Sequence, residues 1–199
     1  MSGKRKAATA TRLAHGGRRR EGQFGAVNPP VVRASTILFD SYRDFIDRKT
    51  RDRRNGEYSY GRLGNPAATA LEGLVAELEG AADCLCVQNG MAAVSGPLLA
   101  LLSAGDHLLV ADTVYEPSRN VSRNTLVRLG IDVEFYDPLI SGGIEALFRD
   151  NTRMIFLESP GSLTFEVQDV PAIAAAARKR GILTMIDNTW ASPLGFRPL

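Results

Sequence analysis

From about residue 65 onward, short apolar runs alternate with segments whose apolar positions recur at helical spacing. The runs are four or five residues long, which is typical of strands that are buried on both faces. We expect strands at 84–87, 107–111, 133–136, 154–157 and 183–186. We expect helices at 66–79, 91–102, 117–129, 143–148 and 170–180. This alternation predicts an α/β fold, with a mostly parallel sheet flanked by helices.

The first of these helices carries signals at both ends. Asn65 is a suitable N-cap, Pro66 suits the first helical position, and Gly80 ends the pattern. Its predicted buried stripe consists of Leu71, Leu74, Val75 and Leu78.

The first part of the chain has few periodic segments. We therefore expect residues 1–62 to form an extended, partly mobile N-terminal arm, and residues 63–199 to form the first part of the main domain. The apolar segment 31–39 suggests that the arm packs against another subunit or the body of the chain.

Composition narrows the possible classes of function. The chain has 199 residues, is 44% hydrophobic and 23% charged, and carries a net charge of +2, which indicates a globular protein without a nucleic-acid partner. No run of 18 apolar residues exists to span a membrane, and the start lacks the apolar segment of a secretory signal. The early cluster of basic residues predicts a solvated tail, and its Arg-rich character leaves a transit peptide open. It comprises Lys4, Arg5, Lys6, Arg12, Arg18, Arg19 and Arg20.

The two cysteines bear on the compartment. Cys84 and Cys86 lie two positions apart in a predicted strand, so their side chains should point to opposite faces and not pair. We interpret them as buried thiols in a reducing, cytoplasmic environment, and we expect no metal site.

Polar and small residues follow four of the predicted strands. These strand tips are 88–91, 112–115, 158–161 and 187–190. Open parallel sheets bind ligands beyond the carboxyl ends of their strands. The tips therefore predict a single ligand site.

Each tip offers one kind of chemistry and one ordinary alternative. Gly90 at a helix start could bind an anion such as phosphate, or could serve the turn alone. Asp187 after a buried strand could pair with a protonated ring nitrogen, or could cap a turn. Tyr115 could lie over a flat cofactor, and Tyr60 and Arg62 could reach phosphate oxygens, but packing and surface roles stay open for all three.

Taken in order along the chain, these segments resemble one enzyme family. The motifs are Asn28–Thr36, Tyr60–Pro66, Asn89–Ala93, Tyr115–Ser118 and Met185–Trp190. They resemble those of the Cys/Met-metabolism family of enzymes that depend on pyridoxal 5'-phosphate (PLP), which has the type I, aspartate-aminotransferase-like fold. The likeness runs from about residue 12 to residue 199.

The resemblance implies a PLP cofactor and a role for each site residue. Gly90 and Met91 would offer backbone N–H groups to the phosphate, Tyr115 would stack on the ring, and Asp187 would pair with the ring nitrogen.

It also implies partners. Tyr60 and Arg62 would reach the phosphate of a neighbouring subunit's cofactor, so the complete protein would be a homo-oligomer, a dimer of dimers. Its substrate would be a small-molecule amino acid such as cystathionine.

Two segments, Tyr115–Ser118 and Phe156–Ser162, are most similar to those of bacterial cystathionine β-lyases. That likeness implies a carbon–sulfur lyase of methionine biosynthesis and transsulfuration, which splits L-cystathionine into homocysteine, pyruvate and ammonia. A cystathionine γ-synthase or γ-lyase is the alternative.

The family's Schiff-base lysine is expected beyond Leu199, so the resemblance assigns no catalytic residue within this chain. The lysines present are Lys4, Lys6, Lys49 and Lys179, and none matches that position. We therefore expect a fragment that is inactive alone; a non-catalytic assembly module is the second alternative.

Overall fold

The computed structural model describes residues 7–18 and 22–199, and it forms two compact units. The first unit runs to Cys86 and the second from Val87 to Pro198, while the predicted arm boundary after residue 62 stays a prediction. Of the basic tail, Lys4, Arg5, Lys6, Arg19 and Arg20 lie outside the described residues. No helix within the described ranges has the length and apolar character needed to cross a membrane.

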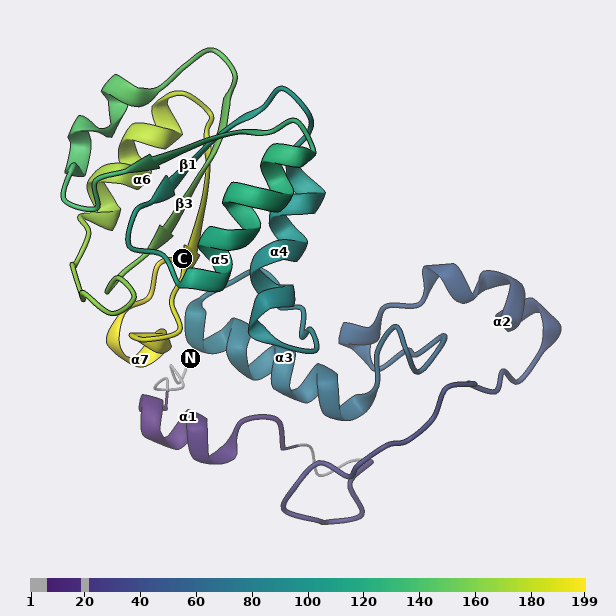
Figure 1. The fold of residues 1–199 in the computed structure, drawn as a ribbon. Helices are drawn as coiled ribbons and strands as arrows, with labels where there is room; N and C mark the ends of the chain where they lie inside the picture. The colour runs from purple at the N-terminus through teal and green to yellow at the C-terminus, as the bar shows by residue number, and fades with distance from the viewer. Residues whose placement is uncertain (1–6, 19–21) are drawn as a thin grey trace. The chain divides into compact units, whose positions relative to one another are not determined.

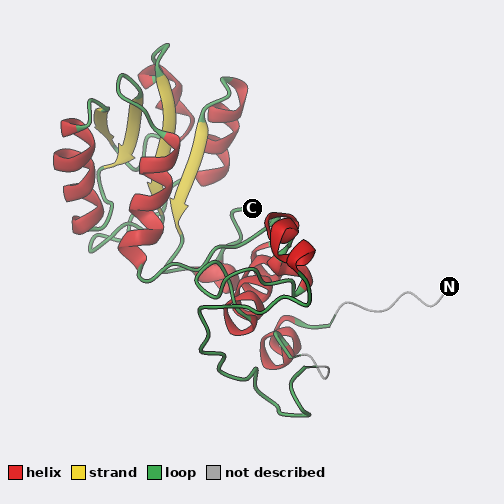
Figure 2. Ribbon diagram, turned by 90° about the vertical axis from the view of Figure 1, so that its right-hand side faces the viewer, coloured by secondary structure: helices red, strands yellow, loops and turns green. Residues whose placement is uncertain are grey.

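The second unit is built on a four-stranded parallel sheet, which confirms the predicted fold class (Figure 2). Its strands, in the spatial order β2-β1-β3-β4, are β1 (His107–Ala111), β2 (Asp132–Tyr136), β3 (Thr152–Glu158) and β4 (Leu183–Asp187). Every residue of β1 is buried, as are the middle residues of β3. The two central strands therefore form the core that the short apolar runs predicted.

Helices cover both faces of this sheet, with α4 and α5 on one face and α6 on the other (Figure 1). The helical segments of this unit are α4 (Gly90–Leu101), α5 (Glu116–Asn120), its π-helical continuation η3 (Val121–Leu126), the 3₁₀ segment η4 (Ser141–Leu147), α6 (Val170–Lys179) and α7 (Ser192–Gly195). The connection from β1 leads to one edge of the sheet, and the connection from β3 leads to the other. The direction therefore reverses between β1 and β3, which is where open α/β sheets bind ligands.

The predicted helix 117–129 forms, but its turns widen in the middle. Ser118 and Ser122 are both buried there, and the Ser122 hydroxyl donates a hydrogen bond to the Ser118 carbonyl at 2.9 Å. A serine that bonds to the carbonyl four residues earlier competes with the helical ladder. This contact accompanies the change from α to π geometry at Val121.

The first unit consists of α1 (Thr9–His15), α2 (Tyr42–Ile46), η1 (Asp47–Thr50), η2 (Arg53–Asn55) and α3 (Pro66–Glu79). The ends of α3 are as predicted: the Asn65 side chain accepts hydrogen bonds from the amides of Ala67 and Ala68, and Gly80 closes the helix at a φ of 80°. Only glycine adopts such a left-handed φ without strain.

The predicted stripe of α3 is wrong at Leu71, which is 53% exposed, whereas the adjacent Glu72 is only 5% exposed. The charge of Glu72 is paired within the unit: Arg53 Nη1 lies 3.1 Å from its carboxylate. Arg53 also donates to the Cys84 carbonyl at 3.4 Å. Burial of a carboxylate is tolerated when its charge is paired in this way.

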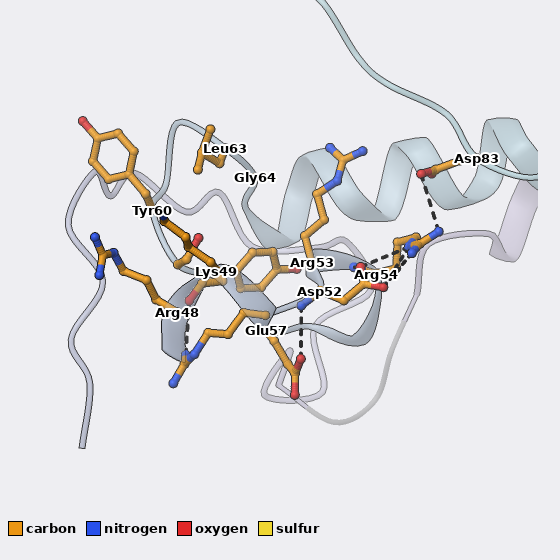
Figure 3. A pocket seen from close by; sticks show the side chains of 13 residues that line it. Arg48, Lys49, Asp52, Arg53, Arg54, Glu57, Tyr60, Leu63, Gly64 and Asp83 are labelled. Atoms are coloured by element: carbon orange, nitrogen blue, oxygen red, sulfur yellow. Dashed lines mark hydrogen bonds and ion pairs between the residues drawn. The ribbon is translucent and has the colours of Figure 1, made fainter. Parts of the chain in front are cut away.

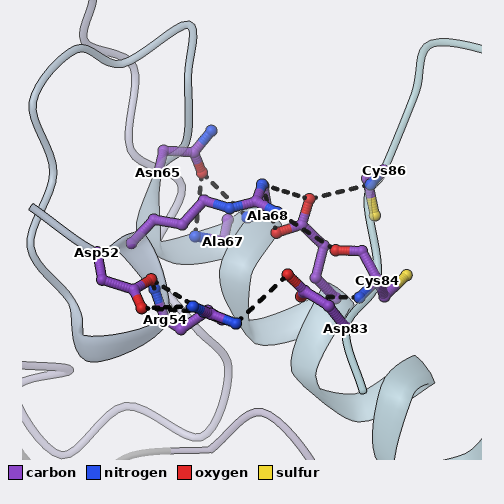
Figure 4. A network of polar contacts seen from close by, with 10 residues as sticks. Asp52, Arg54, Asn65, Ala67, Ala68, Asp83, Cys84 and Cys86 are labelled. Carbon is purple, nitrogen blue, oxygen red and sulfur yellow. Dashed lines mark hydrogen bonds and ion pairs between the residues drawn. The ribbon is translucent and has the colours of Figure 1, made fainter. Parts of the chain in front are cut away.

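The predicted strand 84–87 is also wrong. The amide of Cys84 donates to Asp83 Oδ1 at 2.8 Å (Figure 4). The amide of Cys86 donates to the Glu72 carboxylate at 2.9 Å. Side chains therefore accept the hydrogen bonds that the backbone of a neighbouring strand would accept in a sheet. Leu85 is 69% exposed. The expectation of two buried thiols fails with the strand, because Cys84 is half-buried and Cys86 exposed; both are free.

His107 is a fully buried ionisable side chain at the start of β1, at the opposite end of the strand from the predicted site. Its Nδ1 lies 2.9 Å from Thr152 Oγ1. Burial lowers the pKa of His107 and the Arg149 guanidinium lowers it further, against the opposing effect of Asp132 and Glu134. The fold therefore favours the neutral imidazole.

This preference predicts a loss of stability in acid. Below about pH 6.5 the unfolded chain takes up a proton on His107 that the folded chain does not, so the free energy of unfolding should fall with a slope of up to about 1.4 kcal/mol per pH unit. Urea unfolding of the wild type and of His107→Gln between pH 5 and 8 measures this slope. The difference between the two proteins should change across that range; parallel curves would contradict the prediction.

Candidate functional site

A cavity of about 570 Å³ lies in the second unit at the carboxyl ends of β1, β3 and β4. Four of the six predicted site residues line it: Gly90, Met91, Tyr115 and Asp187. They come from the start of α4, the segment after β1 and the end of β4. The structure thus brings the predicted segments together at one cavity, although the segment before Gly90 forms no strand.

The start of α4 provides one wall of the cavity. Asn89 caps this helix through its side chain, which accepts from the amide of Ala92 at 2.9 Å, and through its carbonyl, which accepts from Ala93 at 3.2 Å. The amides of Gly90 and Met91 have no hydrogen-bond partner among the described residues. Nothing lies within 4 Å of the point where a Gly90 side chain would begin. Free amides at the positive end of a helix, with open space before them, can bind an anion.

Asp187 lies on the wall formed by β4 and is half-buried. Its Oδ1 accepts a hydrogen bond from the amide of Thr189 at 3.0 Å. Asp187 therefore does cap a turn, which was the alternative role for this residue, and the turn uses one of its two carboxylate oxygens. The other oxygen makes no hydrogen bond within the described residues, and it can accept a proton-bearing group in the cavity.

Glu158, the last residue of β3, is a site residue to which sequence reasoning gave no role. Its Oε2 accepts a hydrogen bond from the amide of Tyr115 at 2.7 Å, and it pairs in register with Asp187 on β4. Burial raises the pKa of Glu158, the Tyr115 amide lowers it, and the charge of Asp187 raises it again. A signal was present, because Glu158 ends an apolar strand just as Asp187 does.

The outer part of the cavity is apolar. Phe165 and Trp190 meet edge to face with ring centres 6.0 Å apart, and Leu163 lies beside them on the cavity lining. Leu163 and Phe165 have positive φ values of 67° and 62°, which is strained for side chains of this size. Sequence reasoning missed these residues, since no pattern marks a strained loop that follows a strand tip.

The other two predicted residues, Tyr60 and Arg62, lie in the first unit. Tyr60 lines a cavity of about 870 Å³ whose walls also carry Arg48, Lys49 and Arg53 (Figure 3). The Arg62 guanidinium lies 5.1 Å from the centre of the Tyr60 ring. Five basic and three acidic side chains line this cavity, so its net charge is positive and it could accept an anion.

The glycine between Tyr60 and Arg62 is packed tightly against the backbone of residues 34 and 35. The Gly61 amide donates to the Ser35 carbonyl at 2.8 Å, and a side chain built on Gly61 would overlap with the Ala34 carbonyl oxygen. Its conformation is ordinary, so space alone requires glycine at this position.

Gly61→Ala is therefore expected to destabilise the first unit by about 1–3 kcal/mol, because the arm must move to admit a methyl group. Gly73→Ala in α3 is the matched control, since nothing lies within 4 Å of the added atom and the change should stabilise the helix by up to about 1 kcal/mol. Amide hydrogen exchange in α3 and in residues 34–62 measures both effects. Equal exchange in the two variants would contradict the role of Gly61.

Comparison with known proteins agrees with this geometry. The pattern of the Cys/Met metabolism PLP-dependent enzymes matches residues 10–199. The chain is 48% identical over 189 residues to a putative cystathionine beta-lyase of Rhizobium johnstonii, covering 95% of this chain and 46% of that protein. It is 44% identical over 191 residues to cystathionine beta-lyase MetC of Escherichia coli, covering 95% and 48% respectively.

The solved structure of cystathionine gamma-lyase from Lactobacillus plantarum, complexed with L-serine, superimposes with a TM-score of 0.82 at 31% identity, covering 94% of this chain and 46% of that one. The chain therefore spans about half the length of these relatives. The match over residues 10–199, together with a parallel sheet whose strand tips meet at one cavity, shows that the chain belongs to the Cys/Met metabolism family of PLP-dependent enzymes.

Proposed function

We propose that the cavity of the second unit is the PLP site of a carbon–sulfur lyase. The free amides of Gly90 and Met91 suit the phosphate, and the Asp187 carboxylate on another wall suits the ring nitrogen. Tyr115 lines the same cavity with a half-exposed ring that can lie against a flat cofactor. The single observation that carries the proposal is this set of anion-binding amides, carboxylate and aromatic ring around one cavity of about 570 Å³.

When bound, PLP supplies an electron-withdrawing ring that stabilises negative charge on a substrate carbon. The residues of this chain serve that chemistry by holding charges in place. An ionised Asp187 raises the pKa of a nitrogen beside it and so keeps a proton there. The amides at the start of α4 bind and orient the phosphate without reorganising, since the helix already aligns them.

For the complete protein we propose α,β-elimination of L-cystathionine to homocysteine, pyruvate and ammonia. The identities of 48% and 44% to relatives described as cystathionine beta-lyases support this substrate. A γ-lyase is the second candidate, favoured by the likeness to the Lactobacillus plantarum structure. For either activity, we propose that Tyr60 and Arg62 bind the phosphate of the cofactor in a neighbouring subunit of a homo-oligomer.

The reacting lysine is proposed to lie outside residues 1–199. Of the two lysines that the structure describes, Lys179 bonds to Glu145 at 2.9 Å and Lys49 lines the first unit's cavity. Neither lines the proposed PLP site. We therefore expect these residues alone to bind the cofactor without turning over substrate.

Cofactor binding can be tested with 4'-deoxypyridoxine 5'-phosphate, which lacks the aldehyde and cannot react with surface lysines. Trp190 is the only tryptophan and lines the cavity, so its fluorescence reports binding at this site. We expect saturable quenching by the analogue, and displacement of the bound analogue by PLP in equilibrium dialysis. An unchanged signal, together with no binding in equilibrium dialysis, would reject the proposed PLP site.

The reaction can be tested with a chimera of residues 1–199 and the remaining half of Escherichia coli MetC. We expect it to release pyruvate from L-cystathionine, and the chain alone to release none. 2-Oxobutanoate as the main keto product would instead support the γ-lyase alternative.

A further inference from the structure

The carboxylate of Glu158 joins two strand tips on either side of the point where the chain reverses its direction through the sheet. Glu158 ends β3, and Tyr115 lies beyond the end of the neighbouring β1. The hydrogen bond between Glu158 Oε2 and the Tyr115 amide is 2.7 Å long and spans 43 positions of sequence. It is a contact to the backbone of a residue that lines the proposed cofactor site.

The backbone of Glu158 is held in place by a chain of hydrogen bonds from buried side chains. Its carbonyl accepts from Gln168 Nε2 at 2.7 Å, and the Gln168 side chain in turn accepts from the Tyr136 hydroxyl at 2.8 Å. Gln168 and Tyr136 are both buried. A buried, fully bonded network of this kind fixes the position of the groups it holds.

Tyr115 has fewer restraints of its own. Its ring is half exposed, and it precedes the short α5 with no side-chain cap. Its carbonyl accepts from the Arg119 amide at 2.9 Å, and two residues earlier Thr113 accepts from Ser162 at 2.7 Å. The Glu158 carboxylate is the only partner of the Tyr115 amide among the described residues.

We propose that Glu158 is a positioning residue, whose carboxylate holds the Tyr115 backbone so that the ring lies ready against the cofactor. This inference rests on the proposed PLP site. The Asp187 carboxylate on the adjacent strand is a second negative charge near Glu158, and the Tyr115 amide favours the ionised form of Glu158 against it. Because the restraint exists before the cofactor arrives, it lowers the ordering cost of binding.

A double-mutant cycle tests whether Glu158 acts through Tyr115. Binding of 4'-deoxypyridoxine 5'-phosphate, followed by Trp190 fluorescence, should be about ten-fold weaker in Glu158→Ala, given the usual strength of hydrogen bonds to charged groups. Glu158→Gln keeps an acceptor at the same place and should remain within about three-fold of the wild type. In a Tyr115→Ala background, Glu158→Ala should have no further effect, because the ring that it positions is gone.

Two results of the cycle would overturn the inference: an unchanged affinity in Glu158→Ala, or an equal loss in the Tyr115→Ala background. Either would leave the PLP site itself standing, provided that the wild type binds the analogue. A wild type that binds none would instead reject the proposed function.

A measurement on the unmodified chain covers the case in which Glu158→Ala does not fold. The amide resonance of Tyr115 should move as Glu158 titrates in acid, at a pH above the usual range for glutamate because its pKa is raised. The amide should also exchange slowly with solvent when Glu158 is ionised. A resonance that does not respond to this titration would remove the proposed restraint.

Discussion

Asp187→Asn is expected to weaken the binding of 4'-deoxypyridoxine 5'-phosphate by about ten- to one hundred-fold at neutral pH, since a hydrogen bond to a charged group contributes roughly 1.5–3 kcal/mol. Asparagine has the same shape and still accepts the Thr189 amide at Oδ1, so the turn after β4 should survive. What is lost is the negative charge that holds a proton on the ring nitrogen. Fluorescence titration of Trp190 measures the change.

The chain offers a closely matched control for this substitution. Asp137 follows β2 as Asp187 ends β4, and its Oδ1 accepts the amide two residues later, that of Leu139, at 2.9 Å. It does not line the proposed PLP site. Asp137→Asn should therefore leave the affinity unchanged. If both variants bind alike, the role proposed for Asp187 is wrong.

Phe156→Ala is expected to lower the free energy of unfolding of the second unit by about 3–5 kcal/mol, the usual cost of removing a fully buried aromatic side chain. Phe156 lies in the middle of β3 with no solvent exposure, between β1 and β4. Its loss removes apolar contacts and leaves a cavity that a sheet packed on both faces cannot easily close. Urea unfolding followed by Trp190 fluorescence reports on this unit alone.

Phe24→Ala is the control, because Phe24 is 99% exposed and its removal should change stability by no more than about 0.5 kcal/mol. If Phe156→Ala proves too unstable to purify, Phe156→Leu should show a loss of about 1.5 kcal/mol or less in the same direction. A Phe156 variant as stable as the Phe24 variant would contradict the burial of β3.

The predicted and observed strands agree where one strand lies against another. β1 was predicted with its observed bounds, and β3 and β4 within a few residues of theirs. The segment 84–87 has the same apolar composition but lacks a strand beside it among the described residues, and its amides bond to Asp83 and Glu72 instead. Apolar composition thus identified segments that can form strands, and pairing decided which of them did.

The candidate site divides in the same way. The convergence of Tyr115 and Asp187 followed from the parallel sheet, because the carboxyl ends of its strands meet on one side. Gly90 follows the segment 84–87, which forms no strand, so only the tertiary structure shows that it joins them. The strand tip that contains Glu158 was part of the predicted site, but the contact of its carboxylate with the Tyr115 amide did not follow, since a glutamate at a strand end is usually solvated. Tyr60 and Arg62 lie in the other unit, so the role given to them stays a prediction.

The sequence by itself determined the parallel α/β architecture, the caps of α3 and the family. Periodicity, capping residues and each single motif are local signals, which can be recognised within a few consecutive residues. Only the tertiary structure decided that Glu72 is buried against Arg53 and that Glu158 holds Tyr115. Those contacts join residues 19 and 43 positions apart. The identity of a charged residue does not reveal which distant partner will compensate its burial, and that partner is set by the register of strands and the packing of helices.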